Sequence, residues 1–343
     1  MIDSKLTKFG GGRIDYIDAS KGIGIMLVVL GHLGTSFFWS STLIYSFHMP
    51  LFFFLSGIFF RRYDSHRIFM KKKIHSLIIP FMWFYLVTSI LVPIALNAFY
   101  GIDVMYYIDS PIISQLIAVY IDEIFPNPPI WFLISLFEVY IIYYILNNIC
   151  EKHLSNGVLW TLGISVIFGL VGCLLSIMSI NLPLYIDTSL TVMPFFALAH
   201  YVYGNRLIQI DRLCTNKVLI FIMVVAIVIL GRYVHFDYRI NEYNRMLLIY
   251  PLGFVGIYLS LITAYKLRTI ATLNYLGRNS IVILCTHFMI IELLQRCIDN
   301  IYGYEIHVKI GVAAVIFLLT MVIESIVIIP LFNKYLPFTI GKK

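Results

Sequence analysis

The chain has 343 residues, of which 60% are hydrophobic and only 13% are charged. A soluble domain has about 45–50% apolar and about 25% charged residues, so this composition excludes a soluble globular protein and indicates an integral membrane protein. The formal net charge of +7 would also suit a nucleic-acid-binding protein, but the basic residues form short clusters between apolar runs rather than one stripe. We therefore expect no nucleic-acid partner, and expect membrane lipids as partners instead.

Apolar runs long enough to cross a bilayer follow one another along the chain. A helix needs about 20 apolar residues to cross the hydrocarbon core, and on this basis the sequence predicts an all-α fold with ten membrane-spanning helices. We expect one integral membrane domain over residues 1–343, with no separate soluble domain. The stretch 97–129 has an apolar part too short to cross, so it is expected to be re-entrant or interfacial. The expected spans are 22–39, 42–60, 74–96, 130–149, 158–180, 189–205, 218–235, 246–265, 279–298 and 309–332.

The distribution of lysine and arginine predicts how the spans are oriented. Ten crossings put both termini on the same side, and the segments on that side hold 20 of the 25 basic residues. Because positive charge is retained in the cytoplasm, both termini are expected to be cytoplasmic. The sequence thus predicts a multi-pass protein of the cytoplasmic (inner) cell membrane.

Three histidines fall inside predicted spans at similar depth. His32, His48 and His287 lie on three different spans, at roughly 16, 20 and 14 Å from the cytoplasmic boundary, for a rise of 1.5 Å per residue. Ionisable side chains within a membrane are costly and by default mark a functional site. Each histidine alone would be explained by a hydrogen bond to a backbone carbonyl, but three at one depth favour a shared site. A neutral imidazole there can accept a proton from a hydroxyl.

Two buried carboxylates are candidates to orient these histidines. Glu138 lies in the fourth span and Glu324 in the tenth, and either can accept an imidazole N–H. Pairing with another polar side chain for packing explains each of them equally well. Cys285 is two residues from His287, and positions i and i+2 do not share a helix face, so a Cys-His nucleophile is not expected.

The start of the first span is a candidate anion site. Asp18 or Ser20 is expected to cap this helix, whose N-terminus favours anions such as phosphate, and Lys21 adds a full positive charge. A basic cluster follows the second span on the same side, although topology alone also explains it. It comprises Arg61, Arg62, Arg67, Lys71, Lys72 and Lys73.

Pro50 is expected to disturb the second span beside His48. Proline lacks a backbone N–H and clashes with the carbonyl four residues earlier, which here belongs to Ser46. The freed backbone groups can then face a cavity.

Two segments together carry a family resemblance. The first runs from Asp18-Ala19-Ser20-Lys21-Gly22 to His32, with ten positions between the basic residue and the histidine, and the second is Phe47–Gly57 (FHMPLFFFLSG). In combination they resemble the acyltransferase 3 family of membrane acyltransferases, and most closely its fucose 4-O-acetylase-like branch. Lys21 stands where many members have arginine, which keeps the charge but not the bidentate geometry.

The resemblance implies transfer of an acyl group, usually acetyl from acetyl-CoA, to a hydroxyl of a cell-surface sugar or its lipid-linked precursor. It implies His32 as the essential histidine and Lys21 with nearby basic residues as the donor site. We expect His32 to be the general base, with His48 or His287 orienting the sugar or stabilising the oxyanion. Glu138 completes the expected catalytic set, and the expected donor-binding residues are Lys21, Asp18, Arg67 and Lys73.

Other functions fit some of these features. A glycan transporter or exporter would use the buried histidines as a proton relay, and an O-succinyltransferase of the same family would differ only in the acyl group. A metal permease would use the three histidines as ligands, but the sequence lacks tight histidine spacing and has few membrane carboxylates. We therefore expect no metal cofactor.

Overall fold

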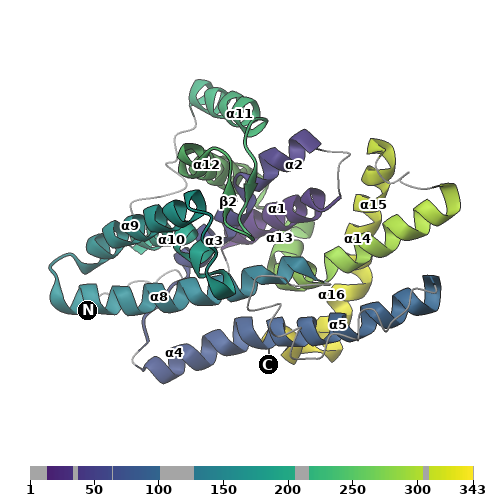
Figure 1. Cartoon of the computed structure of the whole chain (residues 1–343), viewed down its shortest axis with the longest axis horizontal. Coiled ribbons are helices and arrows are strands. Elements are labelled where there is room, and N and C mark those ends of the chain that lie inside the picture. The colour runs from purple at the N-terminus through teal and green to yellow at the C-terminus, as the bar shows by residue number, and fades with distance from the viewer. Residues whose placement is uncertain are drawn as a thin grey trace.

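The computed structural model describes residues 14–33, 38–63, 65–100, 127–204, 216–303 and 309–342. Over these residues the protein is almost entirely helical, as the composition predicted, and the helices pack side by side as a bundle (Figure 1). The described strands are β1 (Phe236–Asp237) and β2 (Glu242–Tyr243), which form one antiparallel hairpin between α11 and α12.

Each of the ten expected spans lies on one or more helices. The helices are α1 (Asp15–Gly31), α2 (Phe38–Tyr45), α3 (His48–Ile58), α4 (His66–Lys73), α5 (Ile79–Tyr100), α8 (Trp131–His153), α9 (Gly157–Ile177), α10 (Ile186–Gly204), α11 (Lys217–Gly231), α12 (Ile249–Leu267), α13 (Ala271–Arg278), α14 (Ser280–Tyr302), α15 (Ile310–Ile323) and α16 (Ile329–Tyr335). The π-helical turns Ile74–Ile78 and Glu324–Ile328 join α4 to α5 and α15 to α16, and short 3-10 turns occur at Pro128–Ile130, Pro183–Tyr185, Met246–Leu248 and Pro337–Ile340.

Six described helical segments are long and apolar enough to cross a membrane. They are His66–Ile90, Pro128–His153, Gly157–Ile177, Met246–Leu267, Ser280–Tyr302 and Ile310–Tyr335, while Thr42–Ile58 and Lys217–Gly231 are apolar but shorter. The count of ten crossings and the cytoplasmic termini therefore stay predictions. Most of the expected re-entrant stretch 97–129 lies outside the described residues.

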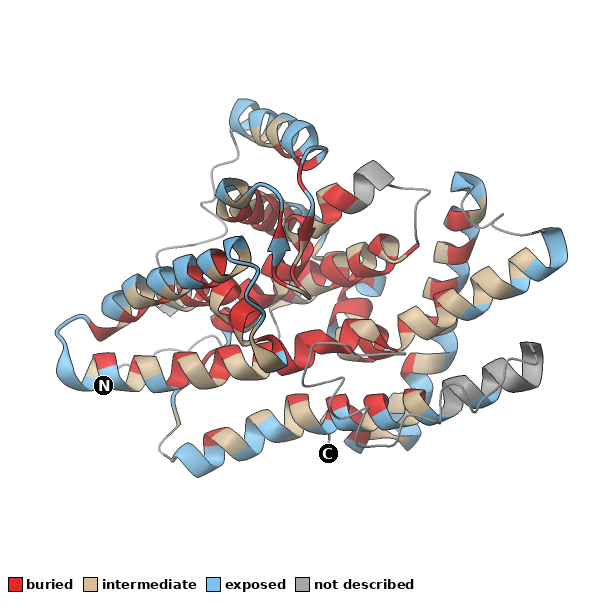
Figure 2. Ribbon diagram, viewed as in Figure 1, coloured by how far each residue is buried: buried red, intermediate tan, exposed pale blue. Residues whose placement is uncertain are grey.

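The outer helices expose apolar side chains while the central ones are buried (Figure 2). Leu170 on α9, Phe221 on α11 and Leu318 on α15 are all more than half exposed. In water such contiguous apolar surface would be an aggregation hazard, whereas lipid chains solvate it. The exposed surface thus agrees with the membrane location inferred from the composition.

The expected cap of the first helix was wrong. Helix α1 begins at Asp15, and its N-cap residue Ile14 makes no side-chain capping hydrogen bond. Asp18 lies inside the first turn, and the Ser20 hydroxyl donates to the Tyr16 carbonyl oxygen at 2.7 Å. Asp18 and Ser20, which were expected to precede the helix, are part of it. Their neighbours Ile17 and Ala19 are fully buried, and this packing stabilises the helical turn.

The second expected span is broken where Pro50 predicted a disturbance. Helix α2 ends at Tyr45 and α3 begins at His48, so that Pro50 sits in the first turn of α3. A proline is tolerated there because the first N–H groups of a helix have no intrahelical acceptor. The break leaves His48 at the start of a helix directed into the bundle.

Glycines let the backbones of α1 and α13 touch. A Cβ atom on Gly22 would collide with the Leu273 carbonyl, and one on Gly277 would collide with the Asp18 carbonyl. Small residues allow such close helix approach in membrane proteins. This contact fixes Lys21 beside the junction between α13 and α14.

We expect Gly277→Ala to destabilise the protein, because the added methyl group must displace backbone atoms of α1. Overpacking of this kind costs about 1–3 kcal/mol. Gly163→Ala on α9 is the matched control, because a Cβ there meets no atom within 4 Å, and alanine favours a helix by about 0.5–1 kcal/mol. Thermal unfolding of the two detergent-purified variants checks this, and an unchanged Tm for Gly277→Ala contradicts it.

Candidate active site

The structure brings the three intramembrane histidines together. His32 terminates α1, and its ring centroid lies 5.2 Å from that of His287 on α14 and 5.6 Å from that of Phe288. The ring of Tyr45 lies between His32 and His48, with centroid distances of 6.5 and 5.2 Å. These side chains come from the three consecutive helices α1, α2 and α3 and from α14, which is distant from them in sequence.

Backbone carbonyls fix the orientation of two of the rings. Nδ1 of His48 lies 2.9 Å from the Ile44 carbonyl oxygen, and Nδ1 of His287 lies 2.6 Å from that of Ile283. A carbonyl oxygen only accepts hydrogen bonds, so each Nδ1 carries the proton and donates it. In the neutral rings Nε2 is then an acceptor, and no described residue donates a hydrogen bond to the buried Nε2 of His287.

Tyr45 ties the end of α1 to α2. Its hydroxyl donates to the Gly31 carbonyl oxygen at 2.8 Å, directly before His32. Carbonyl oxygens at a helix C-terminus lack intrahelical donors, so this bond satisfies one of them and positions the histidine. Sequence analysis did not identify Tyr45 as a site residue.

A cavity of about 320 Å³ adjoins the histidines. Its walls come from the ends of α1, α2 and α3, from the turn before α8, from α14 and from the β-hairpin. Its lining residues are Val28, His32, Tyr45, His48, Met49, Pro128, Pro129, Trp131, His235, Phe236, Asp237, Tyr238, Arg239, Leu284 and Phe288. We call it the histidine cavity.

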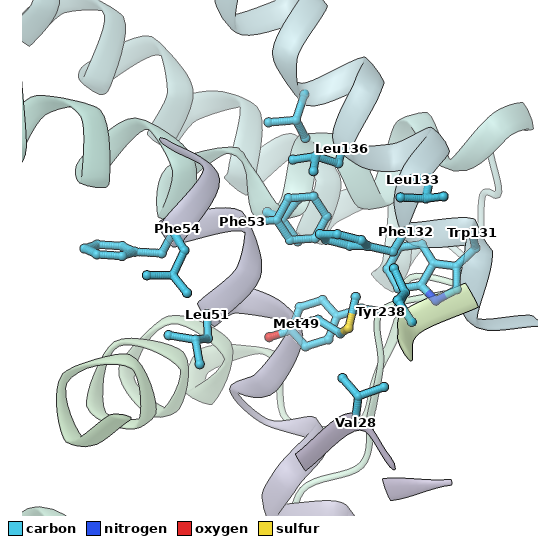
Figure 3. Packing of buried hydrophobic residues seen from close by; sticks show 14 of the residues in the cluster. Val28, Met49, Leu51, Phe53, Phe54, Trp131, Phe132, Leu133, Leu136 and Tyr238 are labelled. Carbon is cyan, nitrogen blue, oxygen red and sulfur yellow. The ribbon is translucent and has the colours of Figure 1, made fainter. Parts of the chain in front are cut away.

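A second, smaller cavity of about 160 Å³ shares Met49 and Leu284 with the histidine cavity. Its other walls are mainly apolar side chains of α1, α3, α8 and α14, and we call it the apolar neck. Met49 lies beside Val28 and Tyr238 at the edge of the packed aromatic cluster that includes Phe132 (Figure 3). The remaining lining residues are Lys21, Ile25, Phe52, Leu55, Ser56, Leu77, Leu133, Leu136, Ser280 and Ile281, with Phe132.

A third cavity of about 560 Å³ is polar and shares Lys21, Ser280 and Ile281 with the apolar neck. We call it the basic chamber. It is lined by Asp18, Lys21, Tyr275, Gly277, Arg278, Asn279, Ser280, Ile281, Asn333 and Lys342. Along α1 the linings follow in order, from Lys21 through Ile25 to His32, a rise of roughly 16 Å. The three cavities therefore form a series that ends at the histidines.

The basic chamber has features of an anion site. Helix α14 begins there, at Ser280, without a side-chain cap, so its first N–H groups face the chamber together with Lys21 and Arg278. The Lys342 Nζ donates a hydrogen bond to Asn333 Oδ1 at 2.6 Å, which holds this side chain in the chamber. Uncapped helix N-termini and cations together favour phosphate groups.

Four of the expected site residues do not line any of these cavities. His287 packs against the ring of His32 instead. The Glu138 carboxylate accepts a hydrogen bond from the Ser189 hydroxyl at 2.8 Å. Arg67 is exposed on α4, and the Lys73 Nζ lies 3.2 Å from the ring centroid of Tyr140. The structure thus places His32, His48, Lys21 and Asp18 along one route, with His287 packed against His32, and leaves Glu138, Arg67 and Lys73 aside.

Glu324 contacts α14 on a different face from His287. Its Oε1 accepts a hydrogen bond from the Thr286 hydroxyl at 2.6 Å, and the side chain is fully buried at the start of a π-helical turn. The carboxylate therefore joins α15 to α14, which agrees with the packing interpretation.

Sequence analysis did not identify several of the residues that line these cavities. Arg278 and Lys342 enter the basic chamber from a short helix and from the C-terminal turn, while Asp237 and Arg239 enter the histidine cavity from the hairpin. Their only sequence signal is charge next to a predicted span. Among the described residues, no group of three His, Cys, Asp or Glu side chains is arranged to hold a metal ion.

Comparison with protein families finds a match over residues 14–329 to the model of the acyltransferase 3 family, described as an acyltransferase domain. No curated protein and no solved structure matches the chain. The fucose 4-O-acetylase-like branch stays a prediction. Because the family model covers most of the chain, the protein belongs to the acyltransferase 3 family of membrane acyltransferases.

Proposed function

We propose that the protein is a membrane O-acyltransferase that moves an acetyl group from cytosolic acetyl-CoA to a hydroxyl of a cell-surface or lipid-linked sugar. The observation that carries this proposal is the series of three cavities, which leads from a basic chamber through an apolar neck to His32 and His48. Along this route the basic chamber, the apolar neck and the histidine cavity follow one another, which matches the order of phosphates, pantetheine arm and thioester in acetyl-CoA.

The basic chamber suits the phosphates of coenzyme A. Three cations line it, Lys21, Arg278 and Lys342, against the single carboxylate of Asp18. Hydrogen bonds in which one partner is charged are shorter and roughly twice as strong as neutral ones. The predicted orientation places Lys21 on the cytoplasmic side, where coenzyme A is found.

The apolar neck suits the pantetheine arm. Its walls are mostly leucine, isoleucine and phenylalanine side chains, with Ser56 and Ser280 as hydroxyl groups. A pocket of this kind binds an elongated ligand by apolar contact and a few polar groups. The thioester would then lie near Met49 and Leu284, which line both the neck and the histidine cavity.

His32 is the group best placed to act as general base. It lies at the C-terminal end of α1, where the partial negative charge of the helix stabilises an imidazolium. The acceptor nitrogen of His287 is close behind it and can accept an N–H from His32, which would hold the tautomer of the base. His287 would then act as a positioning residue.

The transfer follows from these positions. His32 removes the proton from the acceptor hydroxyl while the oxygen forms a bond to the thioester carbon. The tetrahedral intermediate collapses by breaking the carbon–sulfur bond, and the imidazolium returns its proton to the departing thiolate. The products are the O-acetyl sugar and coenzyme A, and no acyl-enzyme is required.

His48 fits an orienting role better than oxyanion stabilisation. Its Nδ1 donates to Ile44, so the remaining nitrogen of the neutral ring has a lone pair and no hydrogen. An oxyanion needs a donor, whereas a sugar hydroxyl can donate to this nitrogen.

We expect His32→Ala to lower kcat by about 10²–10⁴-fold, the usual contribution of a general base. His200→Gln is the matched control, because His200 is on a helix of the same bundle but bonds to Tyr143 at 2.7 Å and lines none of the three cavities. The measurement is transfer of labelled acetyl to a sugar acceptor by purified protein. Turnover retained by a folded His32→Ala variant would refute the assignment of the base.

We expect Lys21→Ala and Lys342→Ala to raise KM for acetyl-CoA about tenfold, since each removes a charged hydrogen bond to phosphate. The same variants should have an unchanged KM for acetyl-pantetheine, which has no nucleotide phosphates. Lys334→Ala, on the exposed face of α16, is the control. Equal increases for both donors would show that these lysines do not bind phosphate.

We expect Leu284→Trp to reduce transfer by filling the junction between the apolar neck and the histidine cavity. Binding of adenosine bisphosphate, which lacks the pantetheine arm, should be unchanged in this variant. Leu293→Trp tests for a general effect of the larger ring, because Leu293 lies on the same helix and is 49% exposed. Normal turnover by Leu284→Trp would exclude this junction as the path of the donor.

A further inference from the structure

The β-hairpin supplies one wall of the histidine cavity. Five consecutive residues, 235–239, line it, although only the first falls within an expected span. They lie at the end of the cavity series remote from the basic chamber, since no hairpin residue lines the apolar neck or that chamber. A group that reaches His32 past the hairpin therefore comes from the side opposite the proposed donor.

The hairpin is held rigidly by polar contacts to two helices, α9 and α10. The Thr188 hydroxyl donates to the Tyr238 carbonyl oxygen at 2.7 Å. The Asn241 side chain accepts from the Thr191 hydroxyl at 2.8 Å and donates to the Gly172 carbonyl oxygen at 3.1 Å. Asn241 has φ of +53°, a conformation that asparagine tolerates better than most residues. The wall is thus formed before any ligand binds.

Aromatic packing adds to this rigidity. The rings of Tyr238 and Tyr243 lie 5.2 Å apart, and Phe236 packs against both. Paired aromatic rings contribute stability beyond the area that they bury. Residues between these rings therefore have little freedom to move.

Asp237 and Arg239 form a charged pair on this wall. The Arg239 backbone N–H donates to Asp237 Oδ1 at 2.9 Å, which fixes the carboxylate. The guanidinium lies 3.8 Å from Asp237 Oδ2, too far for a hydrogen bond. Both side chains are about one third exposed, at 33% and 36%, so each can still bind a ligand.

This arrangement complements two adjacent hydroxyl groups. One hydroxyl donates to the carboxylate and its neighbour accepts from the guanidinium, as each group requires. The opposite charges of the pair balance, so the wall favours a neutral ligand over a phosphate or a carboxylate. His32 lines the same cavity as Asp237 and Arg239, so a hydroxyl bound by the pair shares that cavity with the base.

We propose that Asp237 and Arg239 bind a vicinal hydroxyl pair of a neutral acceptor sugar and thereby set which sugar is acylated. The rings of Tyr45, Trp131 and Phe288, which line the same cavity, provide the apolar surface on which the face of a sugar ring packs. This inference rests on the proposed function and assigns its acceptor site.

The test measures acetyl transfer from labelled acetyl-CoA to a panel of neutral methyl glycosides by the purified full-length protein. Asp237→Asn and Arg239→Gln should raise KM for the preferred glycoside about tenfold to a hundredfold, as expected for lost hydrogen bonds to charged groups. KM for acetyl-CoA should not change, which also shows that the variants are folded. Glu242→Gln is the matched control, because Glu242 pairs with Asp237 across the hairpin but does not line the cavity.

Deoxy analogues make the test specific to hydroxyl recognition. For one of the mono-deoxy forms of the preferred glycoside, Asp237→Asn should cause no further rise in KM, because the hydroxyl that it binds is already missing. The same KM in Asp237→Asn and Glu242→Gln would overturn this inference while leaving the proposed function intact. Preferential transfer to anionic glycosides would also overturn it, and failure of the wild type to acetylate any glycoside would overturn both.

Discussion

Hydrogen bonds from two buried imidazoles to backbone carbonyl oxygens determine the chemistry around the histidine cavity. A buried polar group must find a partner inside the protein, because lipid offers none. His48 and His287 satisfy one nitrogen in this way and present the other as an acceptor. The cavity therefore contains a proton acceptor, His48, besides His32, and a hydroxyl is the kind of ligand that such a cavity binds.

The break between α2 and α3 makes this arrangement possible. In an uninterrupted helix the Ile44 carbonyl would accept the N–H of His48. Because Pro50 interrupts the helix, that carbonyl instead accepts the imidazole proton of His48. Tyr45, at the end of the preceding helix, bonds to Gly31. One proline thus affects the positions of both His48 and the residue before His32.

Residue counting predicted that the histidines lie near one another, because helix rise is constant, and the break at Ser46 followed from the chemistry of proline. Their depth in the membrane stays a prediction. The start of α1 was misplaced because packing against α13, which is distant in sequence, stabilises a helix through Asp18. Glu138 was a reasonable candidate by depth, but depth does not specify which face of a helix a side chain occupies. The hairpin could not be predicted, since only long-range contacts such as that of Thr188 place it over the cavity.

The two ends of the cavity series differ in charge. The basic chamber combines three cations with one carboxylate, whereas the charged residues that line the histidine cavity are one aspartate and one arginine. An anionic donor is therefore attracted to the end at Lys21, because opposite charges in a cleft raise the local concentration of a ligand. At the other end the balanced pair offers no net attraction for phosphate. In the proposed reaction this asymmetry separates a charged donor from a neutral acceptor without a moving gate, with the two substrates on opposite sides of the histidines.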